Sequence, residues 1–504
     1  SATHKEMYNQ VYRLDALDAY NQKLVKRIKV KGINLKGSTG TTGYLYLERI
    51  EISSGKPPVA VVEYEVRKGD SIKRVREKLT KGDNLHELSG GMPAYQGYNI
   101  LNIDAYLGKV EIGSQVLYPG EVVGDMNETD FRRIQIRETI LSHLEKEKQL
   151  YAKGIKVLTL FFIDHVEKYR QYDETGAEVA GEYARIFEQE YATLRSNYLD
   201  LFQQEYNDYL HKHSVRESHR GYEPANYFDY LKRDDAERVH SGYFSIDKKS
   251  KRVIDSTVKR GSEESDDQSA YELIMKDKER LLSFDEPVRF IFSHSALKEG
   301  WDNPNVFQIC ALKHSDATIR RRQEVGRGMR LCVNADGARQ DFDTIGDEVQ
   351  EINALTVIAS ESYEAFAKGL QNEIADTLKE RPQKADVEFF LGKLLTNEQG
   401  ESLRLTKPQA EKLVNKLLYE RILNEDNKIT DAGRDAIKQG TITLPDELKQ
   451  YAAAVCGLLS GITSGELPKI DNDRNTQTLT PNKNFFKTEF QNLWGKINLK
   501  TVYE

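Results

Sequence analysis

The sequence predicts an α/β protein whose central part is a parallel β-sheet covered by helices. Short apolar runs that read as strands alternate with helical segments from Gly154 to Ile374, which is typical of a parallel sheet with helical crossovers. The flanking stretches differ from this pattern. Residues 23–66 read as successive strands, and the chain beyond Arg381 reads mainly as helices.

Composition describes an ordinary folded protein with several domains. The chain has 504 residues, more than one hydrophobic core usually serves, so we expect about three or four domains. Its 73 Lys and Arg against 80 Asp and Glu leave a formal charge of -7, so a surface that binds nucleic acid has to be local. The cysteines Cys310, Cys332 and Cys456 lie far apart without a CxxC pair, which argues against disulfides and zinc.

We expect the protein to be cytoplasmic and without membrane association. The widely spaced cysteines fit a reducing compartment. No apolar run approaches the roughly 20 residues that span a bilayer, and no leader with basic and apolar regions opens the chain. Because it starts at Ser1 without a Met, we expect it to be part of a longer protein.

The first module, residues 4–150, is expected to be rich in strands and to end in a connecting helix. Strands at residues 44–52 and 59–66 flank a turn at 53–56. Six basic residues and no acidic one occur from Lys23 to Lys36, so Lys29 and Lys31 are candidates to follow a phosphate backbone. The alternative is a solvated face of a sheet.

The second module, residues 151–380, carries the predicted parallel sheet. We expect its strands at residues 155–163, 288–293, 305–312 and 355–359, the last followed by a helix at 361–374. A large insertion at about 181–285 interrupts them, with a long helix at 183–211 and a hairpin at 243–253.

The third module, residues 381–504, is predicted to be mainly helical. Thr406 to Gln409 form a capping box, with Pro408 near the start of an amphipathic helix. Residues 424–430 then resemble a short wing before another helix at 431–438. A winged-helix-like module is one interpretation, and an α-helical packing domain is the other.

The strongest local signal is the segment QEVGRGMR, Gln323 to Arg330. Residues three apart share one face of a helix, so Arg327 and Arg330 are expected to point together. Two guanidinium groups can stabilise the charge that develops on a phosphoryl group during nucleotide hydrolysis. The alternative is a surface helix whose arginines form salt bridges.

A second element lies just upstream, where the strand ending at Ser293 leads into SHSALKEGWDNP. The hydroxyl groups of Ser293 and Ser295 can donate to a DNA phosphate. Gly300 permits a close backbone approach, and Asp302 can reach a nucleotide ribose or Arg327. The two motifs agree in order and spacing.

These motifs carry a resemblance to a known family. FSHSALKEGWDNPNVFQ followed by QEVGRGMRLCVN resembles motifs V and VI of the restriction (Res) subunits of type III restriction-modification enzymes, which are helicase-like proteins of superfamily two. Residues 1–3 resemble motif III, at the end of the first motor lobe. Residues 155–169 resemble motif IV, and residues 355–374 resemble the stretch that closes the second RecA-like lobe. The resemblance covers nearly the whole chain. It implies a second RecA-like helicase lobe with a β-rich insertion and a C-terminal, mainly helical spacer.

The resemblance implies roles for residues that match its motifs. Ser1 and Thr3 would couple ATP hydrolysis to movement, and Gly300 and Asp302 would lie by the nucleotide. Gln323 would contact the nucleotide or the network between lobes. The arginine fingers would be Arg327 and Arg330.

At one position the sequence departs from the family. His294 stands where many helicases have the Thr of motif V. The contact with a DNA phosphate is therefore open between Ser293 and Ser295.

Two strings only imitate nucleotide-binding motifs. Gly32 to Thr39 resembles a phosphate loop, but Ser38 stands where the motif needs Lys. Asp285 and Glu286 precede a strand, whereas the magnesium-binding Asp-Glu pair ends one. We therefore expect the phosphate loop and the Asp-Glu box to belong to a first lobe, and this chain alone to be inactive.

The resemblance also implies cofactors and partners. The intact enzyme would use ATP and Mg²⁺, act on double-stranded DNA, pair with a methyltransferase (Mod) subunit and cleave unmodified DNA. Its nuclease domain would follow this chain, because the string at 445–449 is too compressed to place metal ligands on adjacent strands. We expect no metal site here. The alternatives are another superfamily-two translocase, of type I restriction or repair, and a non-catalytic DNA-binding or assembly module.

Overall fold

The computed structural model describes residues 16–36, 43–52, 55–69, 71–124, 126–212, 223–246, 253–254, 274, 278–294, 303–312, 324–361, 363–378, 384–397, 399–460, 462 and 469–474. The chain divides into two compact units. The larger contains residues 25–367 and 470–504, and the smaller contains residues 1–24 and 368–469.

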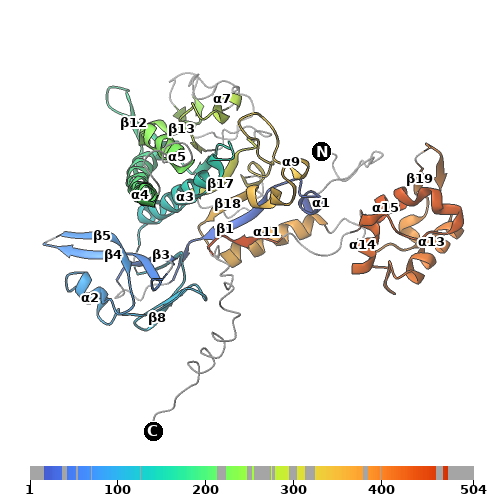
Figure 1. Cartoon of the computed structure of the whole chain (residues 1–504), viewed down its shortest axis with the longest axis horizontal. Coiled ribbons are helices and arrows are strands. Elements are labelled where there is room, and N and C mark those ends of the chain that lie inside the picture. The colour runs from blue at the N-terminus through green and yellow to red at the C-terminus, as the bar shows by residue number, and fades with distance from the viewer. Residues whose placement is uncertain are drawn as a thin grey trace, which may run out of the picture. The chain divides into compact units, whose positions relative to one another are not determined.

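A seven-stranded sheet forms the centre of the larger unit, and every pairing in it is parallel (Figure 1). Its strands, in spatial order, are β13 (His240–Tyr243), β16 (Phe290–Ser293), β10 (Leu158–Ile163), β17 (Val306–Leu312), β18 (Ala354–Ala359), β1 (Arg27–Gly32) and β21 (Asp471–Asn472). The predicted α/β class is confirmed, and the sheet with its flanking helices has the architecture of a RecA-like helicase lobe.

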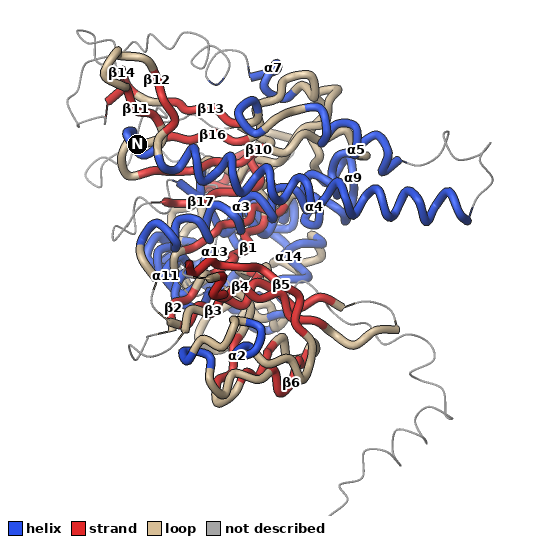
Figure 2. The backbone as a smooth tube through the Cα atoms, turned by 90° about the vertical axis from the view of Figure 1, so that its left-hand side faces the viewer, coloured by secondary structure: helices blue, strands red, loops and turns tan. Residues whose placement is uncertain are grey.

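Helices cover the sheet of this unit, and Figure 2 shows the two longest, α3 and α4, running side by side. The helices are α3 (Glu128–Tyr151), α4 (Glu182–Lys212), α5 (Glu223–Arg233), α7 (Lys278–Leu282), α9 (Phe342–Ile345), α10 (Val349–Ile352) and the first part of α11 (Tyr363–Leu378). Helix α3 begins where the Asn127 side chain accepts a hydrogen bond from the Asp130 N–H (2.9 Å). It packs against β10, β17 and β18.

Strand β1 differs from the sequence-based expectation, which placed residues 27–32 in the β-rich module. It pairs in parallel with β18, with Ile28 opposite Leu355 and Val30 opposite Val357. The two strands are far apart in the sequence. Periodicity predicts that a segment is a strand but does not identify a partner so distant along the chain.

The β-rich module follows β1 in the same unit. One sheet has the order β2 (Asn34–Leu35), β9 (Glu121–Val123), β3 (Leu45–Glu51), β4 (Val59–Lys68) and β5 (Ser71–Leu79), and a second has β6 (Ile100–Asp104), β7 (Lys109–Ile112) and β8 (Gln115–Leu117). The short helix α2 (Leu85–Leu88) lies between β5 and β6 in the sequence. Residues from both sheets share one hydrophobic core, in which Tyr64, Tyr95 and Val110 are buried.

The predicted insertion supplies a helix that packs beside the central sheet and a strand that belongs to it. The long helix expected at 183–211 is α4. The hairpin expected at 243–253 corresponds to the antiparallel pair of β14 (Ser245–Ile246) with β15 (Val253–Ile254). A second antiparallel pair, β11 (Arg170–Tyr172) with β12 (Glu178–Ala180), directly precedes the insertion. Strand β13 pairs with β16, so the insertion also supplies an edge strand of the parallel sheet.

The smaller unit is mainly helical, as expected. It contains α1 (Ala16–Asn21), α12 (Val387–Phe390), α13 (Lys407–Tyr419), α14 (Asp431–Gln439), α15 (Ala452–Ser460) and the hairpin of β19 (Leu394–Thr396) and β20 (Ser402–Arg404). The capping box predicted at Thr406 starts α13, since the Thr406 N–H donates to Gln409 Oε1 at 3.0 Å. The predicted wing is a tight loop closed by one bridge between Leu423 and Ile429.

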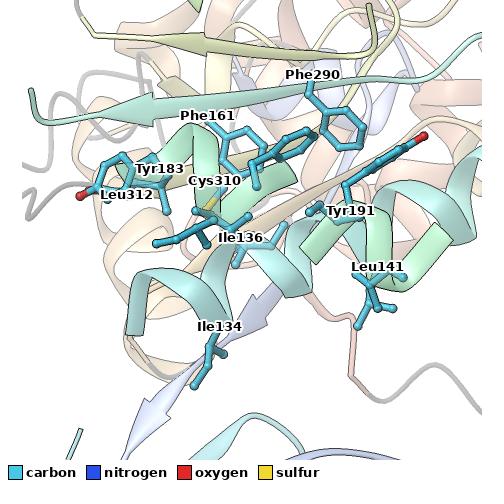
Figure 3. Close-up of a cluster of buried hydrophobic side chains, with 14 of the residues drawn as sticks. Ile134, Ile136, Leu141, Phe161, Tyr183, Tyr191, Phe290, Cys310 and Leu312 are labelled. Carbon is cyan, nitrogen blue, oxygen red and sulfur yellow. The ribbon is translucent and has the colours of Figure 1, made fainter. Parts of the chain in front are cut away.

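An aromatic core fills the space between the sheet and helices α3 and α4 of the larger unit (Figure 3). Phe161 and Phe290 project from neighbouring strands, and Tyr191 of α4 meets the Phe290 ring edge-on, with 5.8 Å between the ring centroids. Such edge-to-face packing stabilises beyond the area that it buries.

A polar network lies beside this aromatic core. Arg289, just ahead of β16, donates to both carboxylate oxygens of Glu147 at 3.1 Å, and neither side chain is exposed. Glu147 also accepts from the Tyr227 hydroxyl at 3.0 Å and lies 3.3 Å from His143 Nε2. A buried charge needs such partners because it has lost its hydration.

The Glu147 network predicts a specific dependence of stability on pH. Burial alone would raise the pKa of Glu147, but the nearby Arg289 and His143 lower it from 4.5 to about 2. The stabilisation from this group is therefore complete above pH 4.5 and is lost as the pH falls toward 2. We expect the difference in unfolding free energy between wild type and Glu147→Gln to shrink over that interval in urea titrations. Parallel pH profiles for the two proteins would contradict this origin.

Candidate functional site

Some residues that the sequence singles out lie within the described part of the chain and others do not. Described are Ser293, His294, Arg327, Arg330, Lys29 and Lys31. Outside it are Ser1, Thr3, Ser295, Gly300, Asp302 and Gln323. The roles of all these residues stay predictions.

The segment from Glu324 to Arg330, here called the arginine turn, is not a continuous helix. The helix ends at Gly326, after which the Arg327 N–H donates to Glu324 O (3.2 Å) and the Gly328 N–H donates to Val325 O (3.0 Å). Arg330 forms an isolated antiparallel bridge with Val25. The expectation that Arg327 and Arg330 share one helical face is therefore wrong. The intervening glycine and turn let the chain leave its helical path.

The arginine turn lies on the face of the sheet opposite α3. Even-numbered residues of β17, such as Cys310, pack with α3, whereas Ile309 and Ala311 line a pocket with Glu324 and Val325. Val325 is buried, Arg327 is half-buried and Arg330 is exposed. The sheet thus holds the apolar side of the turn and leaves Arg330 at the surface.

Gly328 permits this close seating. A Cβ atom at Gly328 would lie 2.7 Å from Leu355 Cδ1 and 3.2 Å from Ile309 Cδ1, whereas one at Gly326 would meet nothing within 4 Å. We expect Gly328→Ala to lower the unfolding free energy by about 1–3 kcal/mol through overpacking. The matched variant Gly326→Ala should change it by less than about 0.5 kcal/mol. Denaturant unfolding of both variants checks this, and equal effects would show that position 328 has no special need for Gly.

Two buried asparagines fix the chain just after the arginine turn. Asn305 exchanges hydrogen bonds with Val333, donating from Nδ2 to its carbonyl and accepting from its N–H, both at 2.9 Å. Asn353 Oδ1 accepts from the Cys332 N–H at 2.8 Å. Because each asparagine directly precedes a strand of the sheet, they tie this segment to β17 and β18.

Sequence reasoning did not single out these two asparagines. A signal was present, because both stand immediately before an apolar strand, at Asn303-Pro-Asn305-Val306 and at Asn353-Ala354. A buried amide at such a place has to form hydrogen bonds, and backbone groups of a neighbouring loop are its usual partners.

Ser293 lies at the carboxyl end of β16, opposite Phe162 of β10 and Tyr243 of β13. Only 1% of it is exposed, and its Oγ has no hydrogen-bond partner within the described ranges. His294 follows and is half-buried. The carboxyl ends of parallel strands are where ligands usually bind in α/β folds.

Lys29 and Lys31 are both engaged in ion pairs on β1. Lys29 Nζ lies 3.0 Å from Asp473, and Lys31 Nζ lies 3.6 Å from Glu145. Burial would lower the pKa of Lys31, but Glu145 and Asp473 outweigh that effect and raise it. Both ammonium groups thus have carboxylates as neighbours.

The described residues contain no group of three or more His, Cys, Asp or Glu side chains arranged to hold a metal ion. No helix among them combines the length and the apolar character needed to cross a membrane.

Comparison with known proteins finds Res subunits of type III restriction-modification enzymes. The chain is 33% identical to that of EcoPI from Escherichia phage P1 over 340 residues, which are 66% of this chain and 30% of that protein. It is 33% identical to that of EcoP15I from Escherichia coli over 345 residues, 66% of this chain and 30% of that protein. It is 29% identical to that of StyLTI from Salmonella typhimurium over 387 residues, 72% of this chain and 33% of that protein.

The matched part thus spans about a third of the length of these relatives, between 30% and 33%. No protein-family model matches the chain.

Proposed function

Because the chain resembles the Res subunits of type III restriction-modification enzymes over two thirds of its length, we propose that it is the second motor lobe of such a subunit. In that role it takes part in ATP-driven movement on DNA that leads to cleavage of unmodified DNA. The observation that supports this most is the arginine turn, which carries the motif VI sequence and is seated on the parallel sheet of a RecA-like lobe.

The arginine turn suits nucleotide hydrolysis at an interface between lobes. ATP with Mg²⁺ supplies the phosphoryl group that is transferred to water. Arg330 is exposed and Arg327 half-buried, so their forked N–H donors fit a triphosphate presented by another lobe. As arginine fingers they would stabilise the charge that spreads over the phosphoryl oxygens.

The remaining motif residues complete the proposal. Asp302, Gly300 and Gln323 would contact the nucleotide or the network between lobes, and Ser1 and Thr3 would couple hydrolysis to movement. Mg²⁺ would be held by the Asp-Glu box that we expect in the first lobe.

Double-stranded DNA is the proposed substrate, and a methyltransferase (Mod) subunit is the proposed partner. Ser293 ends β16 at the carboxyl edge of the sheet. In the motif V sequence, the hydroxyl groups of Ser293 and Ser295 would donate to a DNA phosphate. Lys29 and Lys31 would add positive charge, although their carboxylate neighbours weaken its attraction for DNA phosphates.

The test uses the whole protein together with its methyltransferase. We expect DNA to stimulate ATP hydrolysis, ATP to drive displacement of a third strand bound along the duplex, and cleavage to occur only on unmodified DNA. Displacement without cleavage would indicate a different superfamily-two translocase. Hydrolysis that is absent with and without DNA would contradict a motor function.

A further inference from the structure

Lys26 connects the two motifs at the candidate site. It directly precedes β1 and is fully buried. Its Nζ donates to the carbonyl of Pro304 at 2.5 Å and to the carbonyl of Arg330. Its backbone N–H donates to Met329 O at 2.8 Å.

The two carbonyls belong to segments that carry different parts of the proposed chemistry. Pro304 stands two residues after Asp302 in the motif V sequence, and Arg330 stands three residues after Arg327 in the arginine turn. One ammonium group therefore ties the end of the nucleotide-side motif to the end of the arginine turn, at the point where both meet the start of β1.

Burying this lysine is costly, and no carboxylate forms an ion pair with it in the described ranges. The Phe307 ring lies beside it, with its centroid 4.8 Å from Nζ. Burial lowers the pKa of Lys26 to about 7. An apolar residue such as Met would fill the same space without that desolvation cost, so packing alone does not explain a lysine here.

We propose that Lys26 is a positioning residue, which holds the end of the arginine turn against Pro304 and the start of β1 so that Arg327 meets the phosphoryl group during hydrolysis. This inference rests on the proposed motor function. Lys26 acts through backbone groups and does not itself touch the nucleotide.

The chain offers a matched control in Lys156. It is also buried just ahead of a strand, β10, and its Nζ donates to the carbonyls of Ser283 (2.8 Å) and Glu286 (2.6 Å). Burial lowers its pKa to about 7 as well. Lys156 and Lys26 thus share their chemistry, but within the described part of the chain the Lys156 side chain donates to Ser283 and Glu286 and not to the arginine turn.

The experiment is a double-mutant cycle on ATP hydrolysis by the whole protein, with Lys26→Met and Arg327→Ala alone and combined. We expect Lys26→Met to lower kcat by about 10 to 100-fold with little change in KM, because small misplacements of a catalytic group have such effects. In the Arg327→Ala background it should lower kcat by less than about threefold, since the group that it positions is already gone. Lys156→Met, measured at equal folded fraction, should keep kcat within about threefold of wild type.

Three outcomes would overturn the inference. Equal loss from Lys26→Met in both backgrounds would mean a general structural role. Equal loss from Lys26→Met and Lys156→Met would mean an effect common to buried lysines, and unchanged kcat in Lys26→Met would mean no role. Wild-type hydrolysis by Arg327→Ala would instead contradict the proposed function, so the two failures are distinguishable.

Discussion

Replacing Arg327 with alanine in the whole protein is expected to lower ATP hydrolysis by about 10³-fold or more, while ATP binding stays nearly unchanged. Guanidinium contacts that form only as charge develops on the phosphoryl group lower the barrier without strengthening ground-state binding. Steady-state hydrolysis and equilibrium binding of ATP, measured on the same preparations, check both parts.

The control for this prediction is Arg339→Ala. Arg339 is exposed and follows the arginine turn in the sequence, after the two residues that Asn305 and Asn353 bind. The substitution therefore removes the same charge from the same part of the chain. We expect its hydrolysis rate to stay within about threefold of wild type. Similar losses in both variants would point to net charge, and wild-type turnover in Arg327→Ala would remove the finger assignment.

The largest expected effect on stability is that of Arg289→Met. This change leaves the carboxylate of Glu147 fully buried without the guanidinium group that donates to both its oxygens. Removing one member of a buried ion pair costs about 3–5 kcal/mol of unfolding free energy. Denaturant unfolding of the chain at pH 7 provides the measurement.

Two further variants show whether the loss of unfolding free energy comes from the Glu147 carboxylate being left without an ion-pair partner. Replacing both partners, as Glu147→Met with Arg289→Met, should restore most of the stability, because an apolar pair needs no hydration. Arg280→Met breaks the ion pair between Arg280 and Glu286, in which the arginine side chain is 64% exposed. This change should lower the unfolding free energy by at most about 1 kcal/mol. A double variant as unstable as Arg289→Met would show that packing, and not charge, causes the loss.

The parts of the fold that follow from local pattern were predictable. Short apolar runs predict the buried strands β10, β16, β17 and β18, and the capping box at Thr406 predicts the start of α13. These features depend on residues close together in the sequence.

Features that depend on distant partners were not predictable in the same way. Strand β1 reads like the strands after it, and only its pairing with β18 places it in the parallel sheet. The basic residue Lys26 reads as part of an exposed basic stretch, yet it is buried because two carbonyls from distant segments surround its ammonium group. The sequence shows that such a residue is basic, but it does not show which distant groups surround it in the fold.

The arginine turn shows the same limit at the candidate site. Its sequence gives the spacing of Arg327 and Arg330, from which a shared helical face was expected. The helix instead ends at Gly326, and the bridge from Val25 to Arg330 sets the direction of the following chain. A motif therefore identifies the residues, while tertiary partners decide their orientation.

The most direct test of an arginine finger compares two nucleotide complexes of the whole protein. ADP with aluminium fluoride mimics the phosphoryl group in the transition state, whereas a non-hydrolysable ATP analogue mimics the ground state. We predict that Arg327→Ala weakens binding of ADP with aluminium fluoride by about 10³-fold and binding of the analogue by less than about threefold. Equal affinity of wild type and Arg327→Ala for the aluminium fluoride complex would contradict a role of this lobe in nucleotide hydrolysis through Arg327.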